Sequence, residues 1–185
     1  MRIKVVIITV KNDYRIRGDH AIVYVKTSRD KKLLFVIIDA EDIEKVKSIS
    51  GFWYAYKAKN QSYYIFGRIN GKPVALYRHI LDYHTSGMKN HVDHINNNTL
   101  DNRKCNLRII SASGNQQNRK GAQRGNISGL RGVSWNKFSK TWDVRVQVSG
   151  KKVYRKRTDS KRKAERMATR AREIYMPYSK EAAKK

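Results

Sequence analysis

Six short stretches in the first half of the chain are dense in β-branched and aromatic residues, a pattern typical of strands. Apolar residues at helical spacing predict a helix over residues 40–49 with Asp39 as its N-cap, and a second, short helix over residues 76–84. The dipeptide Asn70-Gly71 predicts a tight type I′ hairpin. The predicted strands span residues 3–10, 21–25, 33–38, 52–58, 63–69 and 72–76.

The second half has a clearer pattern. Valines at 144, 146 and 148 alternate with polar residues, which predicts a half-buried strand that turns at Ser149-Gly150 into another strand over residues 152–157. After Asp159 or Ser160 as cap, an apolar stripe from residue 164 to residue 175 predicts a helix that Pro177 limits. Residues 111–120 are a shorter predicted helix, capped by Ser111 or Ser113.

The aromatic residues of the first half have two interpretations. Trp53 and the tyrosines could stack on nucleic-acid bases, but aromatic side chains in strands are more often part of a core. We therefore expect most of them to be packed.

Charge changes the picture most. Forty-one Lys and Arg against 15 Asp and Glu give a formal net charge of +26, which points to a large polyanionic partner such as nucleic acid. Residues 121–185 carry 19 basic and five acidic side chains, so the last third is expected to bind the polyanion most strongly.

Other classes are disfavoured. The longest apolar run, residues 5–8, is far shorter than a bilayer span of about 20 residues. It also lacks the length and cleavage site of a signal peptide, so we expect an intracellular, cytoplasmic protein. Cys105 is the single cysteine, which excludes an intrachain disulfide and zinc sites built on paired cysteines.

Residues 93–118 concentrate the groups that phosphodiester hydrolysis needs. Mg²⁺ prefers a carboxylate and neutral oxygens, which Asp93 and Asn115 could supply. The imidazole of His94 could then take a proton from water at neutral pH. Because neighbouring residues in a regular strand face opposite ways, the strand must end or bend after His94, as the run Asn96-Asn97-Asn98 favours.

This segment resembles the HNH endonuclease motif, particularly its phage and intron-encoded branch, through Asp93, His94, Asn106 and Asn115. The resemblance implies a ββα-metal finger in which Asp93 and Asn115 bind one divalent metal, Mg²⁺ or alternatively Mn²⁺, and no zinc. It further implies that His94 activates water and that Asn106 is structural. Family members carry a His-Arg pair upstream, where this chain has Tyr77-Arg78. The predicted DNA contacts of this part are Arg78, Arg103, Arg108 and Asn118.

Residues 129–175 resemble the Apetala/ethylene-response-factor type of DNA-binding domain, beginning with Arg131-Gly132-Val133-Ser134-Trp135. The resemblance implies a three-stranded antiparallel sheet packed on one helix, with the outer face of the sheet in the major groove. Arg145 could read guanine and Gln147 adenine. The sequence departs from the family after its third strand, at residues 155–158. The predicted contacts are Arg131, Trp135, Arg145, Gln147, Lys152 and Arg155, with Tyr154 as a weaker candidate.

The sequence thus predicts an α+β protein. Residues 1–120 combine a strand-rich region with the nuclease module, whose core is 77–120; a linker follows at 121–128, the basic module at 129–176 and a tail at 177–185. The expected function is metal-dependent cleavage of double-stranded DNA of the nicking or homing type, inside the host cell of a phage or mobile element. We expect a monomer with no membrane partner and no small-molecule cofactor. The alternatives are a non-cleaving, sequence-specific DNA-binding regulator and an RNA-binding protein.

Overall fold

A computed structural model describes residues 12–83, 90–119 and 121–184 of the chain. The protein is α+β, with several sheets and few helices. It divides into two compact units: residues 1–88 with 98–108, and residues 89–97 with 109–185. The predicted boundary at residues 121–128 lies within the second unit. The predicted strand at residues 3–10 lies outside the described residues.

The first unit is built on a sheet that is six-stranded within the described residues. Strand β2 pairs with β3 along one edge, while its other edge meets β1 at its start and β4, in parallel, at its end. Strands β4, β5 and β6 continue the sheet as an antiparallel meander. Both residues of Asn70-Gly71 have positive φ, 49° and 75°, which confirms the predicted hairpin turn. The strands are β1 (Tyr14–Arg17), β2 (His20–Thr27), β3 (Leu33–Asp39), β4 (Tyr54–Lys57), β5 (Tyr63–Ile69) and β6 (Lys72–Ala75).

Trp53 belongs to the core of this unit. Its side chain is 2% exposed, and its indole Nε1 donates a hydrogen bond to the carbonyl of Val46 at 2.8 Å. Asn12 bonds both the N–H and the carbonyl of Trp53 through its side chain. The expectation that Trp53 is part of a core is therefore confirmed.

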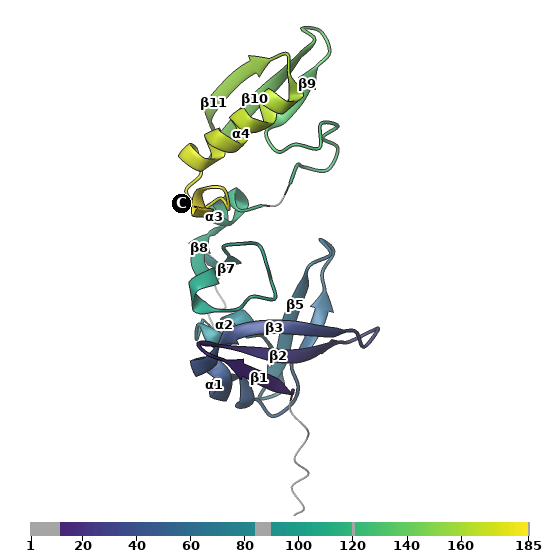
Figure 1. Cartoon of the computed structure of the whole chain (residues 1–185), viewed down its shortest axis with the longest axis vertical. Helices are drawn as coiled ribbons and strands as arrows, with labels where there is room; N and C mark the ends of the chain where they lie inside the picture. Colours follow the sequence, from purple (N-terminus) through teal and green to yellow (C-terminus); the bar gives the residue numbers. More distant parts are fainter. Residues whose placement is uncertain (1–11, 84–89, 120, 185) are drawn as a thin grey trace, which may run out of the picture. The chain divides into compact units, whose positions relative to one another are not determined.

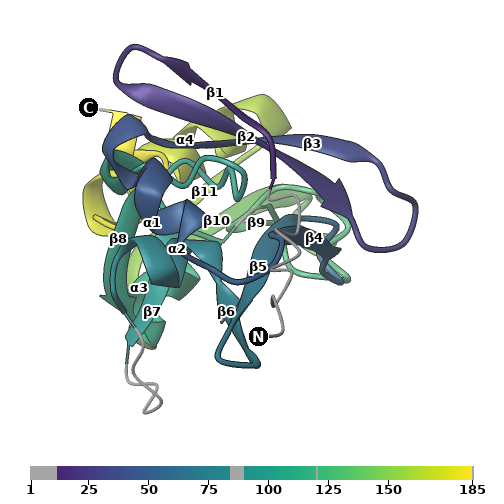
Figure 2. The same ribbon diagram turned by 90° about the horizontal axis from the view of Figure 1, so that it is seen from below.

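Both predicted helices of this unit are shorter than the sequence indicated. A 3₁₀ turn, η1 (Ala40–Asp42), precedes α1 (Ile43–Lys47), and Asp39 makes no capping bond because its carboxylate accepts the backbone N–H of Lys104. Helix α2 (Leu76–Ile80) ends before Asp82, whose φ of 51° is incompatible with a helix. The two helices pack against each other (Figure 2), and Lys45 Nζ donates to the carbonyl of Ile80 at 3.0 Å.

The segment 98–108 docks on strand β3 of the first unit. The carbonyl of Leu100 accepts from Ile37 N at 2.8 Å, and Asn102 N donates to the Ile37 carbonyl at 2.7 Å. The ammonium of Lys104 pairs with Glu41 and Asp42. These pairings raise the pKa of Lys104 and lower that of Glu41. The strand-rich region thus holds one part of the segment predicted to carry chemistry.

Strand β7 (Asn90–His94) comes before the docked segment in the sequence, and strand β8 (Leu107–Ser111) and helix α3 (Ala112–Gln117) come at its end and after it. Strands β7 and β8 pair as a two-stranded sheet. Between the two strands lies a 3₁₀ turn, η2 (Lys104–Asn106). The hydroxyl of Ser111 accepts from Gly114 N at 3.2 Å, which confirms Ser111 as a cap of the predicted helix.

The C-terminal part of the second unit is a three-stranded antiparallel sheet covered on one face by α4 (Lys161–Tyr175), as Figure 1 shows. Strand β10 (Thr141–Val148) lies between β9 (Val133–Asn136) and β11 (Lys151–Thr158). Val133, Val144, Ala164 and Ala168 form its core, and the predicted helix is confirmed with Ser160 as its cap. A last 3₁₀ turn, η3 (Ala182–Lys184), follows.

The end of the predicted linker is built onto this module. The side chain of Asn126 donates to the carbonyls of Leu130 and Val133, and the hydroxyl of Ser128 donates to the Val133 carbonyl at 2.7 Å.

Within the described part of the chain, no helix is long and apolar enough to cross a membrane.

Two glycines of this module allow a matched stability test. Gly132 and Gly150 have nearly the same φ, 80° and 79°, but an added Cβ at Gly132 would lie 2.7 Å from the carbonyl oxygen of Arg145, while at Gly150 it would meet nothing within 4 Å. We expect Gly150→Ala to cost about 1–2 kcal/mol of unfolding free energy through backbone strain, and Gly132→Ala about 1–3 kcal/mol more through the clash. Urea denaturation would measure both, and equal losses would contradict the close approach.

Candidate functional site

Asp93 and His94 close strand β7, as predicted. The strand ends at His94, and the chain then turns: Asn97 has a φ of 61°, and its N–H donates to the His94 carbonyl at 2.9 Å. The His94 side chain is buried, and that of Asp93 is half-buried. The asparagine run therefore ends the regular strand directly after the two residues that the sequence singled out.

Asn118 connects helix α3 to this strand end. Its amide Nδ2 lies 3.0 and 3.2 Å from the two carboxylate oxygens of Asp93, and it donates to the His94 carbonyl at 2.8 Å. Its Oδ1 accepts from Asn97 at 3.1 Å. Asn118 is 3% exposed. One buried amide thus orients the Asp93 carboxylate and ties the backbone of His94 to the end of α3.

Asn115 lies one helical turn before Asn118. Residues three apart lie on the same side of a helix, so Asn115 and Asn118 share the side of α3 from which Asn118 reaches Asp93, and α3 packs against β7. Within the described residues, the Asn115 side chain makes no hydrogen bond. The same part of the chain contains no group of three or more His, Cys, Asp or Glu side chains that could hold a metal. A metal here would depend on one carboxylate and amide oxygens.

The other predicted residues of this segment belong to the first unit. Asn106 is buried, and its Nδ2 donates to the carbonyl of Asp101 at 2.7 Å. Arg103 makes two parallel 2.8 Å bonds to the buried carboxylate of Asp101, which raise the pKa of the guanidinium. Asn106 and Asp101 therefore hold the loop together from within. Arg108 lies half-buried on β8, and Arg78 half-buried on α2.

Arg145, Gln147, Lys152 and Arg155 are exposed and lie on one face of the three-stranded sheet. Residues directly opposite each other on antiparallel strands share a face, and the register pairs Arg145 with Arg155 and Gln147 with Lys152. These four predicted contacts are thus together on the face that α4 leaves uncovered.

Two other candidates lie on the α4 side instead. Trp135 is opposite Trp142, with ring centroids 4.9 Å apart, and Trp142 packs against the core under α4. Tyr154 packs against both core clusters of the module and faces Tyr175 of α4. The placement of Tyr154 on the outer face was therefore wrong, because Tyr154 is opposite inward-facing Val146.

Asp143 lies on the outer face of the sheet, where the alternation of valines with polar residues predicted exposure to solvent. Its carboxylate is nevertheless buried. It accepts 2.8 Å hydrogen bonds from Arg145 and from Arg157. Burial would raise the pKa of Asp143, but the hydrogen bonds from the two guanidinium groups outweigh it and the pKa lies below its usual value. Asp143 thus fixes the positions of two arginines on the predicted DNA-binding face.

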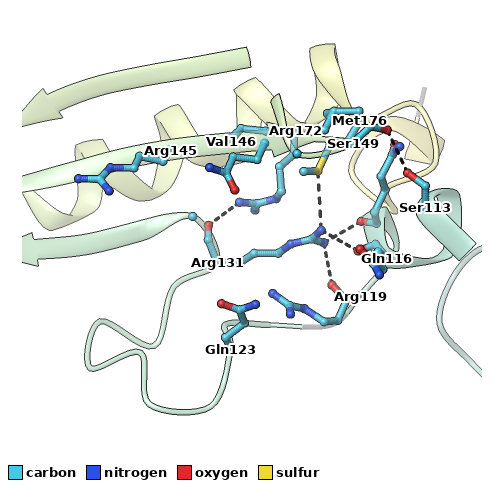
Figure 3. A pocket seen from close by; sticks show the side chains of 15 residues that line it. Ser113, Gln116, Arg119, Gln123, Arg131, Arg145, Val146, Ser149, Arg172 and Met176 are labelled. Atoms are coloured by element: carbon cyan, nitrogen blue, oxygen red, sulfur yellow. Dashed lines mark hydrogen bonds between the residues drawn. The ribbon is translucent and has the colours of Figure 1, made fainter. Parts of the chain in front are cut away.

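Arg131 joins helix α3 to the C-terminal module. Its guanidinium donates to the carbonyls of Gln116, Gln117 and Arg119, at 3.1, 2.7 and 2.8 Å, as Figure 3 shows in part. Gln116 and Gln117 are the last two residues of α3, where carbonyls lack partners within the helix, and Arg119 lies two residues beyond its end. Burial and the nearby charges of Arg172 and Arg119 lower the pKa of Arg131. The sequence indicated a DNA contact here and did not indicate this link.

Sequence reasoning missed the structural roles of Asn118, Asp101 and Asp143. The spacing of Asn118, one turn after Asn115, was a usable signal, since it places the two on one helix side. The pairing of Asp143 depends on Arg157, which is 14 residues away, and no local pattern marks it.

Comparisons with known proteins add a partial similarity. No family model matches the chain, and no solved structure matches it. Protein 3.8 of Escherichia phage T7 is 38% identical over 61 residues, which are 33% of this chain and 50% of that protein. The chain therefore spans about half the length of the curated relative it matches.

The central position of Asn118 can be tested by stability. Asn118→Ala removes the donor to Asp93 and to the buried His94 carbonyl, and we expect a loss of about 1–3 kcal/mol of unfolding free energy. Asn115→Ala, one turn away, removes no hydrogen bond and should stay within about 0.5 kcal/mol of the parent. Urea denaturation measures both, and equal effects would show that the Asn118 contacts are not structural.

The lowered pKa of Asp143 predicts a pH dependence. A carboxylate whose pKa is lower in the folded state contributes stability above its unfolded pKa, and this stability is lost as pH falls through the folded value. We expect the melting temperature to fall between about pH 5 and pH 2. Asp143→Asn should flatten that profile, whereas Asp159→Asn, at an exposed aspartate of the same module, should retain it. An unchanged slope in Asp143→Asn would refute the role.

Proposed function

We propose that this chain is a metal-dependent DNA endonuclease of the HNH type, in which β7, β8 and α3 form the ββα-metal finger. The observation that carries the proposal is the Asn118 amide, which holds the Asp93 carboxylate and the backbone of His94 against the end of α3. The strand–strand–helix order and the turn directly after His94 support it further.

The donor set suits a hard divalent cation. Asp93 and Asn115 offer a carboxylate and an amide oxygen, which Mg²⁺ accepts together with water. A carboxylate has about four lone-pair sites, so Asp93 can accept from Asn118 and bind a cation at the same time. When bound, the cation would offset the negative charge that builds up on the phosphate during the reaction.

The protein groups would then divide the work of hydrolysis. His94 takes a proton from the attacking water, whose oxygen forms a bond to phosphorus. The bond between phosphorus and the 3′-oxygen breaks, and that oxygen takes up a proton, leaving a 5′-phosphate and a 3′-hydroxyl. Asn118 is a positioning residue because it acts through Asp93 and the His94 backbone.

Binding is assigned to the basic C-terminal module, which in this proposal corresponds to the Apetala/ethylene-response-factor type. Arg145, Gln147, Lys152 and Arg155 share its uncovered face. Because Asp143 already orients Arg145, that guanidinium loses less conformational freedom on binding than an unrestrained one would. Sequence choice and cleavage are thus assigned to different parts of the second unit.

Cleavage of supercoiled plasmid with Mg²⁺, with Mn²⁺ and with chelator tests the proposal. We expect metal-dependent conversion to open circles, and a loss of at least about 100-fold in rate for Asp93→Ala and His94→Ala, since each removes a group that acts on the reacting atoms. Matched controls are Glu44→Ala and His20→Ala, which remove a carboxylate and an imidazole from the first unit.

The outcomes separate the candidate functions. Undiminished metal-dependent cleavage in both site variants would place the catalytic centre elsewhere. Salt-sensitive binding to duplex DNA without cleavage under any metal would favour a DNA-binding regulator. Preference for single-stranded RNA over duplex DNA would favour an RNA-binding protein.

A further inference from the structure

A groove of about 750 Å³ lies within the second unit, between α3 and the β10–β11 turn. Arg119, Gln116 and Gln123 line it on the side of α3 and the following segment, and Arg145 and Gln147 line it on the side of the sheet. Figure 3 shows the Arg131 guanidinium between these two sides. None of the described residues that line the groove is acidic.

The arginines of the groove differ in whether a carboxylate of the protein neutralises their charge. Arg172 bonds Glu181 and the carbonyl of Arg131, and Arg145 bonds Asp143. Among the described residues, the Arg131 guanidinium bonds only neutral carbonyl groups and the sulfur of Met176. Arg119 is exposed, and within the described residues its guanidinium makes no hydrogen bond or ion pair. The groove therefore holds more positive charge than the protein itself neutralises.

We infer that this groove binds the sugar-phosphate backbone of one DNA strand, running from the outer face of the three-stranded sheet to helix α3. Arg145 and Gln147 belong both to that face and to the groove, and the other wall includes α3, the helix that carries Asn115. Amide side chains such as Gln116 and Gln123 donate to phosphate oxygens without sequence preference. The identity of the occupant as DNA rests on the proposed function.

The surroundings of Arg131 are a second observation that supports this inference. Its guanidinium is partly buried between the like charges of Arg172 and Arg119, and this surrounding lowers its pKa. A phosphate beside Arg119 would offset that repulsion, so DNA binding and the link between α3 and the module would reinforce each other.

Binding measured without metal tests the groove independently of cleavage. Fluorescence anisotropy of a labelled random-sequence duplex of about 30 base pairs, in chelator and over a series of salt concentrations, gives the dissociation constant and its salt slope. We expect Arg119→Gln to weaken binding several-fold and to reduce the slope by about 0.9, the value for one phosphate contact. Gln123→Glu, which places a carboxylate in the groove, should weaken binding further.

Arg170→Gln is the matched control. Arg170 is an exposed arginine of α4 whose charge is paired with Glu173, and it does not line the groove. Arg170→Gln removes the same unit of charge as Arg119→Gln, but from a surface outside the groove. We therefore expect the salt slope of Arg170→Gln to equal that of the parent protein. If Arg119→Gln has the same salt slope as the parent protein, or if Arg119→Gln and Arg170→Gln change the slope equally, the groove does not bind the DNA backbone. The nuclease proposal would be unaffected by either result. Absence of salt-dependent duplex binding by the parent protein would overturn both.

Discussion

The bonds from the Arg131 guanidinium to the end of helix α3 are the contact on which the site in the second unit depends. A helix of six residues is too short to be stable by itself in water. Ser111 caps its start, Arg131 satisfies carbonyls at its end, and Asn118 directly follows. Asn118 in turn holds Asp93 and the backbone of His94. The geometry of the strand end is thus linked through α3 to the fold of the basic module.

Charge in the second unit is distributed in a way that favours an anionic partner. Three of the five acidic side chains of residues 121–185 form ion pairs: Asp143 with Arg145 and Arg157, Glu173 with Arg170, and Glu181 with Arg172. These pairs orient particular guanidinium groups and leave most of the positive charge uncompensated. A polyanion can then bind to groups that are already in place, which lowers the entropic cost of binding.

The strand-rich first unit has a structural role that follows from its contacts. Residues 98–106 lie between β7 and β8 in the sequence. Yet the backbone of Leu100 and Asn102 bonds strand β3, and Lys104 bonds Asp39, Glu41 and Asp42. The loop that contains Asn106 is therefore shaped by residues about 65 positions earlier in the chain. No periodicity of the sequence could reveal this, because strand β3 has the same alternation whether or not another segment docks on its edge.

The sequence alone determined the features that depend on near neighbours: the hairpin at Asn70-Gly71, the strand that ends at His94, the Ser111 cap, and the long helix with its apolar stripe. Only the tertiary structure decided the partners of polar side chains. It buried Asp143 between two arginines, directed Arg131 to the carbonyls of α3 and Asp39 to Lys104, and turned Tyr154 toward α4. The physical reason is range: dihedral preferences and amphipathic periods act over a few residues, whereas a buried polar group needs a partner that any part of the chain can supply.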